Sequence, residues 1–285
     1  MTVDVGFAAG VLGLVDAAGV YSIGVQPEGG DGVSTKPRTA FVTGASNGFG
    51  AAIVRRFAAE GARVVALARR QDRLAGLAAE LGDSVLPVRL DVRDRAAVQD
   101  VVAGLPAEFA EIDVLVNNAG LAKGLNPAQE ADLDDWEEMI DTNGKGLVYC
   151  TRTILPGMVK RHRGHVVNLG SVAGTYPYPG GNVYGATKAF VHQFSLNLRS
   201  DLHGTGVRVT SVEPGLSGET EFSTVRFGGD QGKADAVYAG MQPLVPADIA
   251  EAVWWVVSQP AHVNINTIEM MPVTQSFAPF QVYRG

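Results

Sequence analysis

The chain has 285 residues, of which 46% are hydrophobic, so it can bury the core of one large domain or of two small ones. Its 23 basic and 30 acidic residues give a net charge of −7 and form no basic stripe, which excludes the electrostatic footprint of a nucleic-acid-binding protein. The single cysteine, Cys150, cannot form an internal disulfide, and the five histidines lack metal-ligand spacing. We therefore expect a cytoplasmic protein that binds no metal.

Residues 1–38 differ from the rest of the chain and precede its first predicted strand. They are rich in Gly, Val and Ala and end in a loop-like Gly-rich run. Asp4 and Asp16 interrupt the apolar residues and no basic residue precedes Lys36, which argues against a secretory signal. No stretch reaches the roughly 18 uncharged apolar residues of a membrane span, so we expect no membrane partner. The segment is interpreted as a flexible extension, or as the product of a misplaced translation start, before one domain at 39–285.

Residues 43–50 read Thr-Gly-Ala-Ser-Asn-Gly-Phe-Gly and lie between an apolar strand pattern and a helical pattern. This is the setting of a dinucleotide-binding loop, although the glycines are spaced G-x-x-x-G-x-G rather than G-x-G-x-x-G. Gly44 would allow the tight turn, Gly48 would let the backbone approach a pyrophosphate, and Gly50 would let the helix pack close to the strand. The predicted cofactor contacts in this loop are Gly44, Ser46, Asn47, Gly48 and Phe49.

Strand patterns alternate with helical patterns after residue 38. The strands are predicted at 39–43, 63–68, 85–90, 114–117, 165–169, 207–212 and 265–271. The helices are predicted at 51–60, 73–81, 96–102, 133–159, 183–203 and 247–257. This alternation predicts an α/β fold: a single Rossmann-like domain with a doubly wound parallel sheet of about seven strands flanked by helices. Ligands of such sheets bind outside the carboxyl ends of the strands, where the polar motifs of this chain fall.

The end of the second predicted strand indicates which dinucleotide is bound. An NAD site usually has a carboxylate about 20 positions after the glycines, whereas this chain has Arg69 and Arg70. Two guanidiniums can bind a 2′-phosphate through charge-assisted hydrogen bonds. The alternative is a solvated pair of arginines at the start of the next helix. We expect NADP to be the cofactor.

Tyr184 and Lys188 are four residues apart in a predicted helix, so their side chains share one face, one turn apart. A free tyrosine, with a pKa of about 10, exchanges protons poorly near neutrality, and a neighbouring ammonium is expected to lower that pKa. The spacing alone occurs by chance on many helices. Because Ser171 lies thirteen residues upstream and the glycine loop precedes both, the combination predicts hydride transfer.

Residues 214–245, called the lid below, form a long stretch that contains Gly228-Gly-Asp-Gln-Gly232. Its length and glycine content predict a mobile cover over the pocket. Arg226 in the lid is a candidate for a bidentate contact with a substrate carboxylate. A surface arginine on a lid helix is an equally good interpretation.

From about residue 39 onward, the chain resembles the short-chain dehydrogenase/reductase family, whose motifs occur here in order. They are the glycine loop, Asp91, the Asn-Asn-Ala-Gly run at 117–120, Asn143, Ser171, Tyr184 with Lys188, and Pro214-Gly215. The segments at 141–146, 178–184, 220–223, 225–227 and 260–266 resemble one branch more narrowly. That branch is the NADP-dependent 3-hydroxy acid dehydrogenases, also described as serine 3-dehydrogenases or L-allo-threonine dehydrogenases.

The resemblance implies roles for four catalytic residues. Tyr184 would be the general acid/base, Lys188 would lower its pKa and hold the nicotinamide ribose, and Ser171 would orient the reacting oxygen. Asn143 would hold a water that links Lys188 to solvent. The further implied cofactor contacts are Asp91, Val92, Asn118, Tyr184, Lys188, Pro214 and Gly215. The implied substrate contacts are Ser171, Tyr184 and Arg226. Asn47 departs from the family, because many NADP-using relatives carry a basic residue in the glycine loop.

The expected activity is hydride transfer between NADP and the 3-hydroxyl or 3-oxo group of small hydroxy acids such as serine, allo-threonine and 3-hydroxyisobutyrate. One alternative is a broader carbonyl, ketone or polyol reductase with the same mechanism. A non-catalytic NADP-binding regulator is another, and the complete catalytic set argues against it. The resemblance also implies a homotetramer whose other partner is a small-molecule substrate.

Overall fold

The computed structural model describes residues 13–15, 21–23 and 39–277, and the chain divides into two compact units at 1–34 and 35–285. In the first unit, β1 (Gly13–Val15) pairs antiparallel with β2 (Tyr21–Ile23). The rest of the expected extension at 1–38 lies outside the described residues, so its flexibility stays a prediction. The second unit carries all the candidate site residues.

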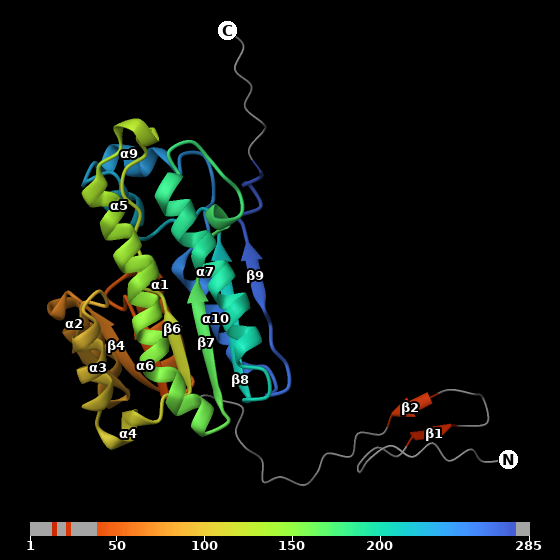
Figure 1. Ribbon diagram of the computed structural model, residues 1–285. Coiled ribbons are helices and arrows are strands. Elements are labelled where there is room, and N and C mark those ends of the chain that lie inside the picture. The colour runs from red at the N-terminus through yellow and green to blue at the C-terminus, as the bar shows by residue number, and fades with distance from the viewer. Residues whose placement is uncertain (1–12, 16–20, 24–38, 278–285) are drawn as a thin grey trace. The chain divides into compact units, whose positions relative to one another are not determined.

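A sheet of seven parallel strands forms the centre of the second unit (Figure 1). The strands are β3 (Thr39–Thr43), β4 (Arg63–Ala68), β5 (Val85–Arg89), β6 (Val114–Asn117), β7 (Gly164–Leu169), β8 (Val207–Pro214) and β9 (Thr267–Met270). Their order is β5-β4-β3-β6-β7-β8-β9, and every neighbouring pair is parallel. The predicted doubly wound sheet is confirmed. The strand order reverses between β3 and β6, which is where such sheets bind ligands.

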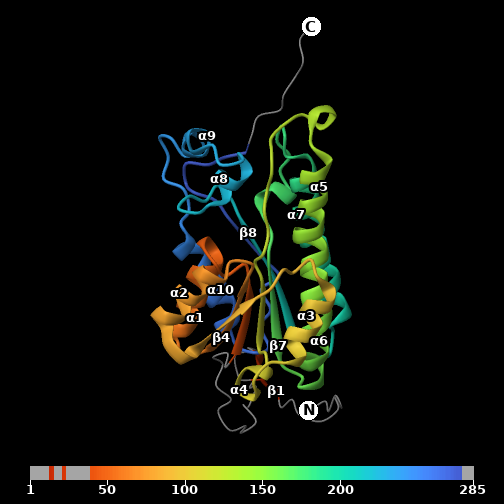
Figure 2. The ribbon, with the colours of Figure 1, turned by 90° about the vertical axis from the view of Figure 1, so that its left-hand side faces the viewer.

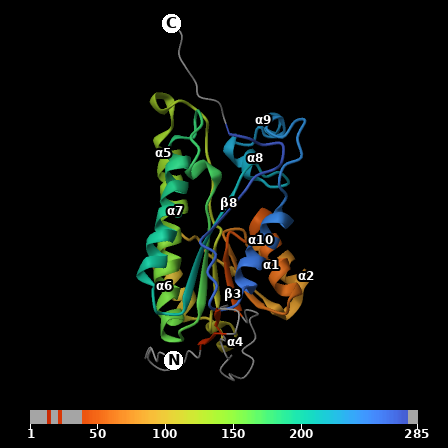
Figure 3. The same ribbon diagram turned by 90° about the vertical axis from the view of Figure 1, so that its right-hand side faces the viewer.

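Helices cover both faces of the sheet (Figures 2 and 3). One face carries α1 (Gly48–Ala59), α2 (Gln71–Leu81) and α10 (Pro246–Ser258). The other carries α3 (Arg95–Ala103), α6 (Leu147–Lys160) and α7 (Asn182–Asp201), with the short α4 (Ala107–Ala110) at the edge. Because strand side chains alternate, Val42 packs into the first core and Phe41 into the second. Burial on both faces explains why the central strands β3, β4 and β6 are largely apolar.

The helix predicted at 133–159 is interrupted, which corrects that prediction. It consists of α5 (Leu133–Ile140), a π-helical segment (Asp141–Gly146) and α6. The helix packs very closely at its interruption: a Cβ on Gly146 would lie 2.6 Å from Cγ2 of Val92. A π-helical segment inserts a residue into the helix and is frequent at functional sites. Here it contains Asn143.

The lid holds two short helices, α8 (Phe222–Arg226) and α9 (Gln231–Ala236). Figure 2 shows them beyond the carboxyl end of β8, on the side of the sheet to which all the strands point. A bridge between Ser217 and Leu244 joins the two ends of the lid. The lid therefore lies where a cover of the ligand crevice is expected, and its mobility stays a prediction.

Candidate active site

A cavity of about 740 Å³ opens at the carboxyl ends of the strands, between the glycine loop and the lid. Its lining includes every predicted site residue except Asn143. The residues concerned are Gly44, Ser46, Asn47, Gly48, Phe49, Arg69, Arg70, Asp91, Val92, Asn118, Ser171, Tyr184, Lys188, Pro214, Gly215 and Arg226. Residues separated by up to 182 positions thus share one cavity, as the topology of the sheet requires.

Tyr184 and Lys188 lie on α7, and each is 7% exposed. Nζ of Lys188 donates a hydrogen bond of 2.7 Å to the carbonyl of Leu169 and lies 5.9 Å from the centroid of the Tyr184 ring. Helix α7 packs tightly on the turn that follows β7, since a Cβ on Gly174 would lie 2.8 Å from the backbone of Lys188. This contact fixes the distance between α7 and the end of β7.

Burial determines the protonation of both side chains. It raises the pKa of Tyr184 to about 12, while a hydrogen bond with Ser171 and the charge of Arg226 act in the opposite direction. Burial also lowers the pKa of Lys188 to about 8, against the charge of Glu213. The expected lowering of the Tyr184 pKa by Lys188 is therefore wrong in this structure, because desolvation of the phenolate outweighs the neighbouring charges. At neutral pH Tyr184 is a phenol.

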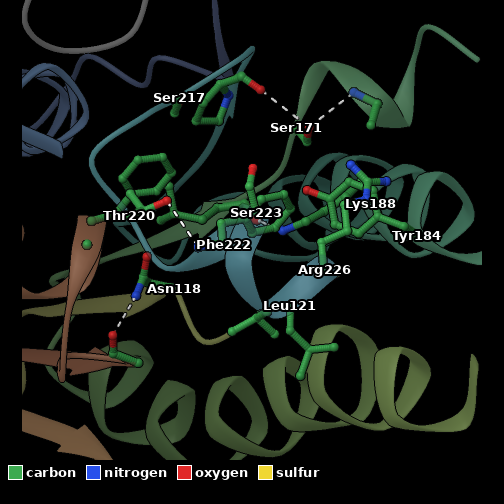
Figure 4. A pocket seen from close by; sticks show the side chains of 18 of the residues that line it. Asn118, Leu121, Ser171, Tyr184, Lys188, Ser217, Thr220, Phe222, Ser223 and Arg226 are labelled. Carbon is green, nitrogen blue, oxygen red and sulfur yellow. Dashed lines mark hydrogen bonds between the residues drawn. The ribbon is translucent and has the colours of Figure 1, made fainter. Parts of the chain in front are cut away.

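Ser171 begins the 3₁₀ turn Val172–Gly174 and ties two strand ends together. Its hydroxyl donates to the carbonyl of Pro214 at 3.3 Å and accepts from the backbone N–H of Ala173 at 3.1 Å. Figure 4 shows these two bonds around Ser171. The hydroxyl also favours the ionised form of Tyr184, and both side chains line the cavity. Ser171 and Tyr184 can therefore contact the same substrate oxygen.

Asn143 is buried, and its side chain is used for protein contacts. Its amide nitrogen donates to the carbonyl of Leu121 at 2.9 Å and to the hydroxyl of Thr187 at 3.0 Å, and its oxygen accepts from the N–H of Leu121 at 2.9 Å. Both amide hydrogens are thus occupied, so the side chain has none to donate to the expected water. Asn143 joins the loop after β6 to α7, next to the turn that carries Tyr184.

Two glycines of the loop are required by its geometry. Gly44 has φ of +68°, and a Cβ there would lie 2.8 Å from Nδ2 of Asn118. A Cβ on Gly50 would lie 2.2 Å from the carbonyl of Gly44. Asn118 donates to the carbonyls of Thr43 and Gly44 at 2.8 and 3.2 Å, so it supports the loop directly (Figure 4). The positions of Gly44 and Gly50 are therefore explained by the close packing of the loop against the residues that follow β6.

The entrance to α1 is open to an anion. Asn47, the residue before the helix, makes no side-chain cap, so the first N–H groups of α1 have no side-chain acceptor from that residue. Arg70 donates to the hydroxyl of Ser46 from Nε and Nη2, at 3.4 and 3.1 Å. Arg69 lines the same end of the cavity, 3.5 Å from Glu138. These donors are of the kind that phosphate groups require.

Asp91 and Val92, two of the cofactor contacts implied by the resemblance, line the cavity together with Arg69. The carboxylate of Asp91 binds the guanidinium of Arg93 at 2.6 Å, and this hydrogen bond lowers the pKa of Asp91. Asp91 is therefore ionised and held in place by a neighbouring residue.

Arg226 of α8 points into the cavity beside Tyr184 (Figure 4). Its guanidinium donates to the hydroxyl of Tyr178 and, at 3.4 Å, to the carbonyl of Gly124. The guanidinium carbon lies 5.4 Å from the ring centroid of Tyr184. Among the described residues Arg226 has no acidic partner within ion-pair distance. The guanidinium of Arg226, which has no carboxylate partner among the described residues, is thus held next to Tyr184, the expected proton donor.

Several lining residues were not identified from the sequence. Phe222 packs edge-on against Tyr184, with 5.7 Å between the ring centroids. The hydroxyl of Tyr238 bonds Ser223 and the carbonyl of Ser217, each at 2.7 Å, inside the lid. Their position within the predicted lid was the only signal in the sequence. Their residue types gave none, because aromatic and hydroxyl side chains also occur where no ligand is bound.

In the described part of the chain, no helix combines the length and apolar character needed to cross a membrane. Nor do three His, Cys, Asp or Glu side chains gather as metal ligands anywhere in residues 13–15, 21–23 and 39–277.

A profile of the short chain dehydrogenase family matches residues 38–227. NADP-dependent 3-hydroxy acid dehydrogenase from Salmonella typhi is 64% identical over 244 residues, which are 86% of this chain and 98% of that protein. Serine 3-dehydrogenase from Agrobacterium fabrum is 55% identical over 246 residues, 86% of this chain and 98% of that protein. The solved structure described as the closed form of serine dehydrogenase complexed with NADP⁺ has a TM-score of 0.86 and 62% identity, covering 87% of this chain and 100% of that one.

Proposed function

This chain belongs to the short-chain dehydrogenase family, and we propose that it is an NADP-dependent oxidoreductase acting on the 3-hydroxyl or 3-oxo group of small hydroxy acids. The observation that carries the substrate class is the position of Arg226, whose guanidinium has no acidic partner among the described residues and lies 5.4 Å from the ring of Tyr184. The names of relatives that are 64% and 55% identical support the same class.

The cavity fits NADP by the chemistry of its donors. Ser46, Arg69 and Arg70 would hold the 2′-phosphate, and the open N-terminus of α1 would hold the pyrophosphate. Asp91 and Val92 would border the adenine. The remaining contacts would come from Gly44, Asn47, Gly48, Phe49, Asn118, Tyr184, Lys188, Pro214 and Gly215. When bound, the nicotinamide supplies or accepts the hydride.

Tyr184 moves the proton in this proposal. With a pKa of about 12 its hydroxyl is protonated at neutral pH, so it can donate to the carbonyl oxygen of a 3-oxo acid. Ser171 holds the same oxygen and orients it. In the direction of oxidation Tyr184 must take up a proton as a phenolate. The charge of Arg226 and the hydrogen bond with Ser171 favour that phenolate, so the same residues can serve both directions of the reaction.

Arg226 would bind the substrate carboxylate while Tyr184 and Ser171 hold the oxygen on carbon 3. Both contacts are possible for a short acid because the guanidinium lies beside the Tyr184 ring. The aromatic rings of Tyr178 and Phe222 lie 5.3 and 5.9 Å from the guanidinium carbon and partly shield it from water, which strengthens its attraction for a carboxylate.

The test is Arg226→Gln, assayed with a 3-hydroxy acid and with a neutral alcohol of similar size. Hydrogen bonds to charged groups contribute about 1.5–3 kcal/mol, so KM for the acid is expected to rise at least about tenfold while KM for the alcohol changes little. Lys233→Gln is the control, because it removes one charge from the same lid outside the cavity lining.

Two other results would contradict the role of Arg226. If both substrates are affected equally, Arg226 positions the lid and the enzyme is a broader carbonyl or polyol reductase. If neither is affected, the carboxylate is bound elsewhere. Turnover of no substrate with either cofactor would instead favour an NADP-binding regulator.

We also propose that the protein is a cytoplasmic homotetramer. Exposed apolar side chains on α5, α7 and α10 support assembly; they are Leu133, Ile140, Phe190, Leu196 and Trp255. The single, buried Cys150 is compatible with a reducing compartment. Light scattering coupled to gel filtration measures the mass of the assembly, and a monomer would contradict the proposal.

A further inference from the structure

Glu221 joins the lid to the opposite wall of the cavity. It lies immediately before α8, and its Oε2 accepts hydrogen bonds from Nδ2 of Asn47 at 2.6 Å and from Nη1 of Arg70 at 2.7 Å. Its Oε1 lies 3.7 Å from Nη2 of Arg73. These partners come from the glycine loop and the start of α2, more than 140 residues earlier in the chain.

The partners of Glu221 are the groups that form the phosphate end of the cavity. Arg70 bonds Ser46 through Nε and Nη2, and it bonds Glu221 through Nη1. A carboxylate and a phosphate present the same kind of oxygen acceptor to a guanidinium. The carboxylate of Glu221 therefore occupies donors on Asn47 and Arg70 that could otherwise bind a phosphate group of a ligand.

The lid backbone is held closely at this contact. A Cβ on Gly48 would lie 3.2 Å from the side chain of Thr220, so the lid packs directly on the glycine loop. Glu219 has φ of +54°, a left-handed conformation that is unfavourable for a residue with a side chain. The lid thus has a strained residue two positions before the carboxylate that anchors it.

We propose that Glu221 competes with the 2′-phosphate for Arg70 and Asn47 and thereby lowers the preference of the site for NADP over NAD, and that it holds the lid to the glycine loop until the phosphate displaces it. This inference rests on the proposed use of NADP. NAD carries a hydroxyl in place of the phosphate and has no charge there with which to displace the carboxylate.

The exposure of the pair makes such an exchange feasible. The side chains of Arg70 and Glu221 are 41% and 40% exposed, so water screens their attraction and the pair is weak. A phosphate near pH 7 carries a charge of about −1.5 to −2 and offers three acceptor oxygens, so it binds the guanidinium more strongly than the carboxylate does. The two anions also repel each other when they share one guanidinium.

The test is Glu221→Gln, which keeps the size of the side chain and removes its charge. Dissociation constants are measured by calorimetry for NADP, NAD, adenosine 2′-monophosphate and adenosine 5′-monophosphate. We expect NADP and the 2′-monophosphate to bind about fivefold more tightly, the effect of one half-exposed charge pair, with NAD and the 5′-monophosphate unchanged. Glu219→Gln is the matched control, because Glu219 is exposed and forms no ion pair among the described residues.

Hydrogen exchange of the amides at 216–230 gives a second readout without turnover. In the unmodified protein, adenosine 2′-monophosphate is expected to increase exchange in the lid, and the 5′-monophosphate is not. In Glu221→Gln the exchange is expected to be high without either ligand. The inference is overturned if Glu221→Gln changes the affinities for NADP and NAD equally, or if it weakens the affinity for NADP. It is also overturned if adenosine 2′-monophosphate does not change hydrogen exchange of the lid in the unmodified protein. If the unmodified protein bound no NADP, the proposed function itself would fail instead.

Discussion

Replacing Lys188 by methionine is expected to abolish turnover and, at neutral pH, to make the protein more stable. Lys188 is 7% exposed, and burial lowers the pKa of its ammonium from 10.5 to about 8. The difference between the two pKa values corresponds to about 3 kcal/mol by which the folded protein disfavours the charged form. Methionine has a similar length and no charge, so the substitution removes this cost while filling the same space.

The gain is partly offset by the lost hydrogen bond from Nζ to the carbonyl of Leu169, which costs about 1–2 kcal/mol. The net increase in the free energy of unfolding is about 1–2 kcal/mol, or about 3–6 °C in Tm for a domain of this size. The pKa of Lys188 is lower in the folded than in the unfolded chain. Between pH 8 and 10.5 the unfolded chain therefore binds more protons, and the wild-type protein gains stability as pH rises. The advantage of the variant should be complete below pH 8 and reversed by about pH 10.5, where the charge penalty is gone and the lost hydrogen bond leaves the variant the less stable of the two.

Urea unfolding followed by circular dichroism, without cofactor, at pH 7 and pH 10 measures both the sign and the pH dependence. Lys160→Met at the exposed end of α6 is the control and should change stability little at either pH. A Lys188→Met protein that is less stable than wild type at pH 7 would refute the reasoning. So would an advantage of the variant that does not decrease as the pH rises.

Three further substitutions or truncations test other parts of the site. Tyr184→Phe should reduce turnover to below a few per cent while NADPH still binds in a fluorescence titration, because only the hydroxyl is lost; substantial activity would assign the proton to another group. Replacing Arg69 and Arg70 by alanine should weaken NADP binding about tenfold or more per productive contact and NAD binding much less, and equal losses would show that the pair does not bind the 2′-phosphate. Deleting residues 1–36 should leave folding and activity nearly unchanged, since β3 begins at Thr39; aggregation or loss of assembly would show that the segment is needed.

The central strands could be predicted because burial on both faces makes them largely apolar. The strands at 39–43, 63–68 and 114–117 have the predicted bounds. The start of α1 was placed three residues late, at 51 instead of Gly48. Glycine has a low helix propensity, so the run Gly48-Phe-Gly50 does not indicate a helix start from the sequence. Tertiary packing outweighs that propensity in the structure.

The interruption of the long helix at 141–146 could not be predicted from the apolar pattern, which continues on both sides of it. At the interruption, Gly146 packs against Val92, which lies 54 residues earlier in the chain. Long-range contacts of this kind leave no local signal. The same reason applies to Glu221, whose partners lie on the glycine loop and α2.

The spacing of Tyr184 and Lys188 correctly placed both residues on one helix, in one cavity. It did not predict the protonation of Tyr184, because the pKa of a phenol depends on how deeply it is buried as well as on its neighbours. The direction of Arg226 was likewise undetermined, because a lid helix of five residues has no periodic pattern from which its inner face could be identified.

The most direct test of the proposed function follows NADPH absorbance while the purified full-length chain oxidises serine, allo-threonine and 3-hydroxyisobutyrate, each compared with a neutral alcohol of similar size and with NAD in place of NADP. NADPH is expected to form with at least one of the three acids, much faster than with the neutral alcohols, and NAD is expected to support little reaction. No turnover of any 3-hydroxy acid, or equal rates with acids and neutral alcohols, would contradict it.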